Sequence, residues 1–115
     1  MPATVTKSFE FSASHSAAGK VFGHNYILHA AFHVHNASEE TGLSEKIERS
    51  LIQKMHSRDL GSDVEFLKNV PPDDLSRLKV FWEIIARETR PARLESLCLE
   101  RNRHTRWTLT ADSSR

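Results

Sequence analysis

The chain has few cysteines, no long apolar run and almost no net charge, and each of these features excludes a class of protein. Its single cysteine, Cys98, excludes a framework of internal disulfide bonds and fits a reducing cytoplasm. No run approaches the ~20 apolar residues of a membrane-spanning helix, and the N-terminus lacks the apolar segment of a secretory signal. Sixteen basic against fifteen acidic residues leave a formal net charge of +1, too small for a nucleic-acid-binding surface. We therefore expect a cytoplasmic protein with neither a membrane nor a nucleic-acid partner.

The length of the chain favours a single folded unit. At 115 residues it is most simply one domain, residues 1–115, which is large enough to bury a core of its own. No internal repeat or low-complexity segment divides it.

Histidine is what the chain has in excess. Five of the seven histidines lie between positions 15 and 35, four of them in the strand-like segment of residues 21–36. Strand alternation places His24 on the apolar face, where an imidazole needs a metal ion or a hydrogen-bond partner. On the opposite face we expect solvent or a second subunit beside His29, His33 and His35.

The remaining pattern predicts three more strands and two helices. A first strand from residue 5 ends at His15, and a short glycine-containing connection pairs it with the second strand, which would bring His15 near His24. Apolar residues at helical spacing predict helices over residues 44–55 and 75–88, followed by strands over 93–101 and 103–110. This order, ββααββ, makes an α+β domain in which a four-stranded antiparallel sheet carries two helices on one face.

The chain contains four short motifs: Phe-Ser-Ala-Ser-His at 11–15, Gly-His-Asn-Tyr at 23–26, Thr-Gly-Leu at 41–43 and Leu-Glu at 99–100. In this order they resemble the motifs of the 6-pyruvoyltetrahydropterin synthase and 6-carboxytetrahydropterin synthase family. The resemblance spans essentially the whole chain and implies the tunnelling fold (T-fold), in which such sheets assemble into a closed barrel. It also implies a homo-oligomer, usually a hexamer of two trimers, with a pterin-like substrate bound between subunits and zinc-dependent carbon–oxygen lyase chemistry.

The resemblance implies a zinc site that this chain carries only in part. Family members bind zinc through three histidines, and His15 and His24 correspond to two of them. Phe22 stands at the third position, and a phenyl ring has no lone pair to donate. The ligand set is therefore incomplete unless another histidine, a carboxylate or a neighbouring subunit supplies a third ligand.

The proton-transfer residues that the resemblance implies are missing. The family's cysteine has no counterpart in residues 16–21, where Lys20 and Ser16 are the only ionisable or hydroxyl side chains. The family's Asp-His pair aligns with His56 and Ser57. General acid–base catalysis contributes about 10²–10⁴-fold to a rate, so its loss alone would leave a slow enzyme. The remaining catalytic candidates are His56, Ser57 and Lys20.

Glu100 corresponds to the glutamate with which the family anchors its substrate. A carboxylate can accept two parallel hydrogen bonds from the N–H and amino group of a pterin's pyrimidinone edge. A plainer interpretation makes Glu100 a solvent-facing strand residue that pairs with Arg101 or Arg103.

Three hypotheses on function remain. The favoured one is a divergent homologue that keeps the oligomeric barrel and a pterin-like pocket but binds without turnover or catalyses a different reaction. The second is an active pterin-directed lyase with a rearranged site, to which His29, His33, His35, His56 or Lys20 contributes. The third is a non-catalytic structural or interaction oligomer. The sequence leaves open the pathway, whether biopterin, folate or queuosine-type synthesis, and the choice between trimer and hexamer.

Overall fold

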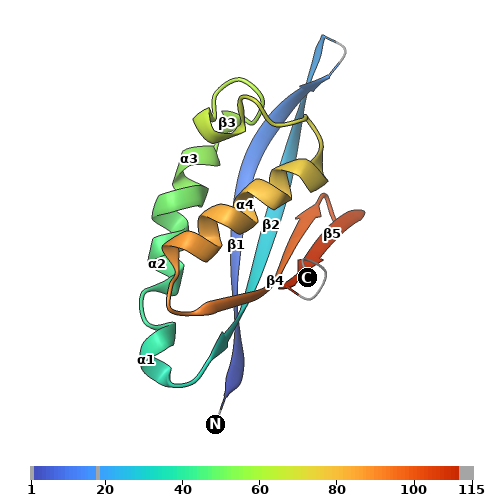
Figure 1. Cartoon of the computed structure of the whole chain (residues 1–115). Helices are drawn as coiled ribbons and strands as arrows, with labels where there is room; N and C mark the ends of the chain where they lie inside the picture. The colour runs from blue at the N-terminus through green and yellow to red at the C-terminus, as the bar shows by residue number, and fades with distance from the viewer. Residues whose placement is uncertain (1, 18, 112–115) are drawn as a thin grey trace.

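A long antiparallel hairpin is the central feature of the structure, a computed structural model that describes residues 2–17 and 19–111. Strands β1 (Ala3–Ala17) and β2 (Lys20–Val34) pair without interruption, from Ala3 opposite Val34 to Ala17 opposite Lys20. The hairpin projects beyond the rest of the molecule at the end near Lys20 (Figure 1). Both predicted strands are confirmed. The ends of the predicted domain, and position 18 of the predicted connection, lie outside the described residues.

The sheet contains one strand more than predicted. Strand β2 pairs with β4 (Arg93–Arg101) and β4 with β5 (Thr105–Thr110), both antiparallel, while the two-residue strand β3 (Arg58–Asp59) pairs in parallel with β1. The spatial order is β3-β1-β2-β4-β5. The α+β class is confirmed, but the four-stranded ββααββ arrangement is wrong, because a two-residue strand is too short to produce a periodic pattern.

Two helical regions connect β2 to β4. The first consists of α1 (Ala37–Glu40), α2 (Leu43–Ile47), a π-helical turn η1 (Glu48–Ile52) and α3 (Gln53–Met55), and the second is α4 (Asp74–Glu88), preceded by the short 3₁₀ helix η2 (Glu65–Leu67). The Asn36 side chain accepts hydrogen bonds from the N–H groups of Ser38 and Glu39 and so begins α1. Asp73 caps α4 in the same way. The two predicted helices are otherwise confirmed.

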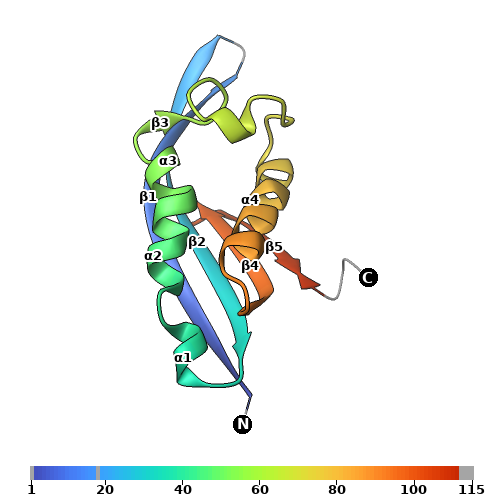
Figure 2. The ribbon, with the colours of Figure 1, turned by 60° about the vertical axis from the view of Figure 1, so that its left-hand side comes forward.

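Both helical regions cover the same face of the sheet, as predicted (Figure 2). The even-numbered residues of β2 from Tyr26 to Val34 point into this interface and are buried, whereas the odd-numbered residues between them are only partly buried. Each fully buried leucine or phenylalanine removed from water contributes about 1.5–3 kcal/mol. The largest fully buried side chains of the core come from both layers: Tyr26, Leu28, Phe32, Leu43, Ile47, Leu51, Met55, Leu60, Leu67, Leu78, Phe81 and Ile85.

Candidate functional site

The sheet separates the predicted site residues into two groups. In the register of β2 and β4, Tyr26 lies opposite Arg101 and Ile27 lies opposite Glu100. Side chains alternate between faces along a strand, so Arg101 shares the helix-covered face with Tyr26 and His24, whereas Glu100 lies on the helix-free face. The predicted metal residues and the predicted substrate residue therefore do not lie together within this chain.

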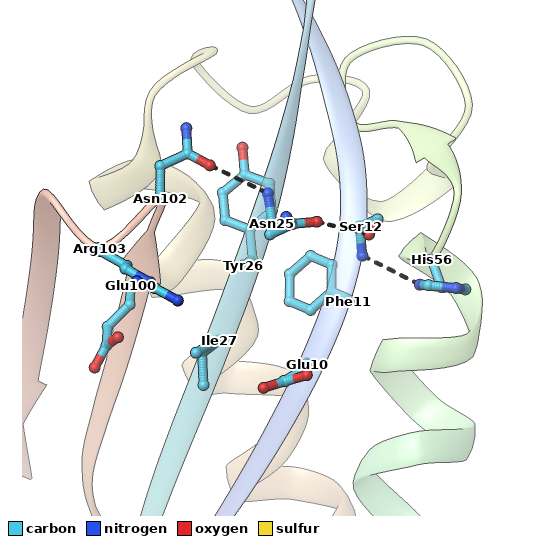
Figure 3. Close-up of a pocket in the computed structure, with 10 residues that line it drawn as sticks. All are labelled: Glu10, Phe11, Ser12, Asn25, Tyr26, Ile27, His56, Glu100, Asn102 and Arg103. Carbon is cyan, nitrogen blue, oxygen red and sulfur yellow. Dashed lines mark hydrogen bonds between the residues drawn. The ribbon is translucent and has the colours of Figure 1, made fainter.

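Glu100 lies in a pocket of about 660 Å³. The register aligns Glu10, Ile27 and Glu100 across three neighbouring strands, and Figure 3 shows the two carboxylates on either side of the Ile27 side chain. The pocket thus combines an apolar centre with acceptor groups at its sides. Its lining residues are Glu10, Phe11, Ser12, Asn25, Tyr26, Ile27, His56, Glu100, Asn102 and Arg103.

A hydrogen-bonded row across the sheet holds the Glu100 carboxylate. His29 Nε2 lies 3.1 Å from Glu100 Oε1, and His29 Nδ1 lies 2.7 Å from Ser8 Oγ. Arg106, on β5, donates to the same Oε1 atom. The plainer interpretation of Glu100 was thus right about an arginine partner and wrong about which one, because Arg101 pairs instead with Asp74, at 3.4 Å.

These contacts keep the Glu100 carboxylate ionised. Burial of the side chain, which is 17% exposed, would raise the pKa of Glu100, but the hydrogen bond from His29 and the charge of Arg106 outweigh burial and lower that pKa overall. Both contacts involve Oε1. Within the described part of the chain, Oε2 has no hydrogen-bond partner and remains available as an acceptor.

The three catalytic candidates lie in different places. His56 lines the Glu100 pocket, where its Nδ1 accepts a hydrogen bond from the Ser12 N–H at 3.1 Å, as Figure 3 shows. Ser57 lines an adjacent pocket of about 350 Å³ together with His24, and its own N–H donates to the Ser12 carbonyl at 2.6 Å. Lys20 is exposed near the end of the hairpin and lines neither of these two pockets. Only His56 therefore shares a pocket with Glu100, and its catalytic role stays a prediction.

His15 and His24 converge as predicted. The two imidazole rings stack with their centroids 4.7 Å apart. The Phe22 ring also stacks on His15, with a centroid distance of 5.4 Å. Phe22 thus lies where a third histidine would complete the predicted ligand set. Among the described residues, no group of three or more His, Cys, Asp or Glu side chains is arranged to hold a metal ion.

Asn102 determines which nitrogen of His24 carries a proton. Its Oδ1 accepts a hydrogen bond from the Asn25 N–H at 3.3 Å, so its Nδ2 is the atom that donates to His24 Nδ1, at 2.6 Å. A donor on Nδ1 leaves the ring proton on Nε2. Burial, together with the charges of His15 and Arg101, lowers the pKa of His24 and keeps the ring neutral.

This arrangement does not fit zinc. A zinc-bound imidazole offers the metal an unprotonated nitrogen and donates a hydrogen bond from its other nitrogen. His24 has the opposite polarity, since Nδ1 accepts and Nε2 carries the proton. Arg101 places a further positive charge beside the pair. Among the described residues, His15 and His24 therefore have no third ligand beside them, and His24 is not in the protonation state that a zinc ligand requires.

The contacts of His29 and Asn102 were not predicted from the sequence. His29 was expected to face solvent or a second subunit and was one candidate for a rearranged site, and Asn102 lies in the connection between the last two predicted strands. The partner of His29 is 71 positions away, so only the register of β2 against β4 could have identified it. Asn102 adopts a positive φ of 53°, which asparagine tolerates better than most residues, and that preference was the one available signal.

Comparisons with known proteins support the fold. No family model matches the chain, and no curated protein matches it by sequence. Among solved structures, it is similar to the 6-pyruvoyl tetrahydropterin synthase of Caenorhabditis elegans, with a TM-score of 0.78 over 96% of each chain and 16% sequence identity. The chain therefore has a 6-pyruvoyl tetrahydropterin synthase-like fold, as the sequence motifs predicted. Similarity at this identity establishes the fold alone. No helix among the described residues is long and apolar enough to cross a membrane.

Proposed function

We propose that this protein binds a pterin or a related heterocycle through Glu100, and that it does so without the zinc-dependent lyase chemistry of the proteins it resembles. One observation carries the proposal. Glu100 is an ionised carboxylate in a pocket of about 660 Å³, on a fold similar to that of a 6-pyruvoyl tetrahydropterin synthase, and it has one oxygen free.

The chemistry of a pterin matches this carboxylate. The pyrimidinone edge presents a ring N–H and an amino group side by side, and a carboxylate can accept one hydrogen bond on each oxygen. Oε2 of Glu100 is free, while Oε1 already accepts from His29 and Arg106. The Arg106 side chain is 65% exposed, and an exposed ion pair contributes only about 0–1 kcal/mol, so a ligand can displace it. Ile27 then provides an apolar surface for the ring.

A second copy of the chain would complete this pocket. Glu10, Ile27 and Glu100 line the pocket from the face of the sheet that no described helix covers (Figure 2). In the family that the motifs resemble, the substrate lies between subunits of a trimer or hexamer. We propose the same homo-oligomer here. Light scattering coupled to size-exclusion chromatography measures the number of chains in the oligomer. A monomer at micromolar concentration would contradict this part of the proposal.

Calorimetric titration with neopterin tests the binding function. We expect Glu100→Gln to weaken binding at least tenfold. The amide has only one acceptor oxygen, and its NH2 group would face an N–H donor of the ligand. Glu95→Gln is the matched control, since Glu95 lies on the same strand but outside the pocket and should leave the affinity unchanged. If wild type and Glu100→Gln behave alike, the proposal fails and a non-catalytic structural or interaction oligomer becomes the better interpretation.

A pterin-directed lyase with a rearranged site is the second candidate, and the position of His56 favours it. His56 lines the same pocket as Glu100 and has its Nε2 free of any partner among the described residues, so it has the placement of a general acid or base. Incubation with dihydroneopterin triphosphate should then release inorganic triphosphate, and His56→Ala should reduce the rate at least 100-fold. A pterin that binds without release of triphosphate would exclude this activity and support binding without turnover.

A further inference from the structure

A third pocket lies between the hairpin and the turn that joins β4 to β5, and His24 and Arg101 line it from the face of the sheet opposite Glu100. Its volume is about 300 Å³. None of its described lining residues is acidic, and three of them are histidines. The lining residues are His15, Phe22, His24, Arg101, Asn102, His104 and Thr105.

His24 presents an unsatisfied hydrogen-bond donor in this region. Its Nε2 is buried and has no partner among residues 2–17 and 19–111. Because Asn102 donates to Nδ1, the neutral ring carries its proton on Nε2. A buried N–H group of this kind requires an acceptor, and a metal ion cannot serve as one. The polar atom that would bind a cation in a zinc site is therefore suited to an anion here.

Arg101 adds a positive charge to the same pocket. One of its terminal nitrogens, Nη1, lies 3.4 Å from the Oδ2 atom of Asp74, the first residue of α4. Asp74 is buried and is the only described carboxylate that pairs with Arg101. A guanidinium group has five N–H donors in a fixed plane, so this contact fixes the orientation of Arg101 and leaves other donors free.

We propose that this pocket binds a phosphate-type oxyanion at the position where the resemblance predicts zinc. A tetrahedral oxyanion presents several acceptor oxygens, and it can accept from His24 Nε2, from the Arg101 guanidinium and from the Thr105 hydroxyl along different directions. His15 and His104 supply further donors. The same residues disfavour a cation, because they present protons and positive charge to it. The pocket shares Asn102 with the Glu100 pocket, but its other lining residues are different, so the two sites can be tested separately.

Titration with inorganic phosphate, followed by calorimetry and by the NMR signals of the histidine rings at one fixed pH, tests the proposal. We expect saturable binding that perturbs the signals of His15 and His24 and leaves those of His35 unchanged. His24→Ala should weaken binding about tenfold, the effect of one charge-assisted hydrogen bond. His35→Ala is the matched control, because His35 lies beyond the opposite end of β2.

A second variant keeps the test valid if His24→Ala unfolds. Asn102→Asp places a negative charge in the pocket and changes the group facing His24 Nδ1 from donor to acceptor, so it should abolish phosphate binding. Absence of saturable binding to the wild type, or equal binding by both variants and the wild type, would overturn the proposal. Tight binding of one zinc ion per wild-type chain would also overturn it.

The phosphate group could be free phosphate or part of the ligand that Glu100 binds, and binding competition distinguishes the two sources. Inorganic phosphate should bind the Glu100→Gln variant as well as it binds wild type. If the group belongs to the ligand held at Glu100, neopterin phosphate binds more tightly than neopterin, and inorganic phosphate competes with neopterin phosphate. If the site takes free phosphate, the two pterins bind equally and inorganic phosphate does not compete with either. Failure of the phosphate site thus leaves the pterin proposal to be judged on its own titration.

Discussion

His29 Nε2 lies 3.1 Å from Glu100 Oε1, a contact between neighbouring strands that joins positions 71 residues apart. His29 is itself held on its other nitrogen by Ser8 Oγ at 2.7 Å, so the imidazole is fixed from both sides. Arg106 reaches the same carboxylate oxygen from an edge strand with most of its side chain in solvent. The two partners of Glu100 therefore differ: His29 is held within the sheet surface, and Arg106 is an exposed neighbour.

Substitution of these two partners should change pterin affinity in opposite directions. His29→Ala removes the fixed support of the carboxylate, and we expect neopterin to bind about three- to tenfold more weakly. Arg106→Gln removes a group that competes with the ligand for Oε1. We expect the affinity for neopterin to be unchanged or up to about fivefold higher, because an exposed ion pair contributes at most about 1 kcal/mol. Calorimetry on both variants measures the two effects. A large loss of affinity in Arg106→Gln would instead identify Arg106 as a ligand-binding residue.

Asp59 should make the stability of the fold depend on pH. It joins β3 to β1, since its carboxylate accepts hydrogen bonds from Ser14 and Ser16 on one oxygen and from Gly61 and Ser62 on the other. Burial alone would raise the pKa of Asp59, but these hydrogen bonds outweigh it and lower the pKa below the ordinary value of 3.8. The stabilisation is therefore complete above the pKa of the unfolded state and is lost as the pH falls through the folded pKa.

Replacement of the Asp59 carboxylate by an amide measures this contribution. We expect Asp59→Asn to lower the free energy of unfolding at pH 7 by about 1–2 kcal/mol, and the difference from wild type to shrink at pH values below 3.8. Urea unfolding at a series of pH values provides the curve. Glu83→Gln, an exposed carboxylate on α4, is the control and should cost less than about 0.5 kcal/mol. A difference independent of pH would show that the charge of Asp59 contributes nothing.

Tyr26 carries a hydroxyl group that the fold does not use. Its oxygen is buried without a hydrogen-bond partner in the described residues, and burial, followed by the charge of Asp74, raises the pKa of Tyr26 to about 12. Its ring stacks on Phe11 with centroids 5.1 Å apart, a contact that phenylalanine would keep. We expect Tyr26→Phe to be neutral or to stabilise the protein by up to about 1 kcal/mol, because a buried unpaired hydroxyl is unfavourable.

Thermal unfolding compares Tyr26→Phe with a substitution that removes packing. Leu28→Ala, at a fully buried neighbour on the same face of β2, should cost about 2–5 kcal/mol. If Tyr26→Phe is itself destabilising by more than about 1 kcal/mol, the hydroxyl has a partner in solution, such as a buried water molecule.

Strands and helices whose burial repeats regularly along the sequence were predictable. Contacts that depend on the register between strands distant in sequence were not. Alternation predicted that Tyr26 and Leu28 share one face of β2 and that Leu97 and Leu99 share one face of β4, because burial imposes a two-residue period on each strand. Strand β3 was missed because it consists of only two residues whose pairing depends on β1. The separation of Glu100 from His24 depends on which residues of β2 and β4 lie opposite each other, and neither strand contains that information alone.

Phe22→His combined with Asn102→Asp should turn the His15–His24 pair into a zinc site. The untagged wild-type protein should contain far less than one zinc per chain by elemental analysis, because Phe22 supplies no ligand and His24 carries its proton on Nε2. Phe22→His adds a third imidazole next to His15 and should raise zinc affinity. If Phe22→His leaves that affinity unchanged, the three side chains do not converge.

The second substitution tests the role assigned to Asn102. An aspartate at this position accepts a hydrogen bond from His24 Nδ1 and so frees the lone pair of Nε2, the arrangement found beside zinc-bound histidines. We expect the double variant to bind zinc about 10–100-fold more tightly than Phe22→His alone, which is the usual effect of such a hydrogen-bond partner. Asn25→Asp in the Phe22→His background is the matched control, because it adds the same charge nearby, while the Asn25 side chain contacts Ser12 rather than His24. Equal gains from Asn25→Asp and Asn102→Asp would mean that net charge, and not the position of the His24 proton, keeps zinc out of this pocket.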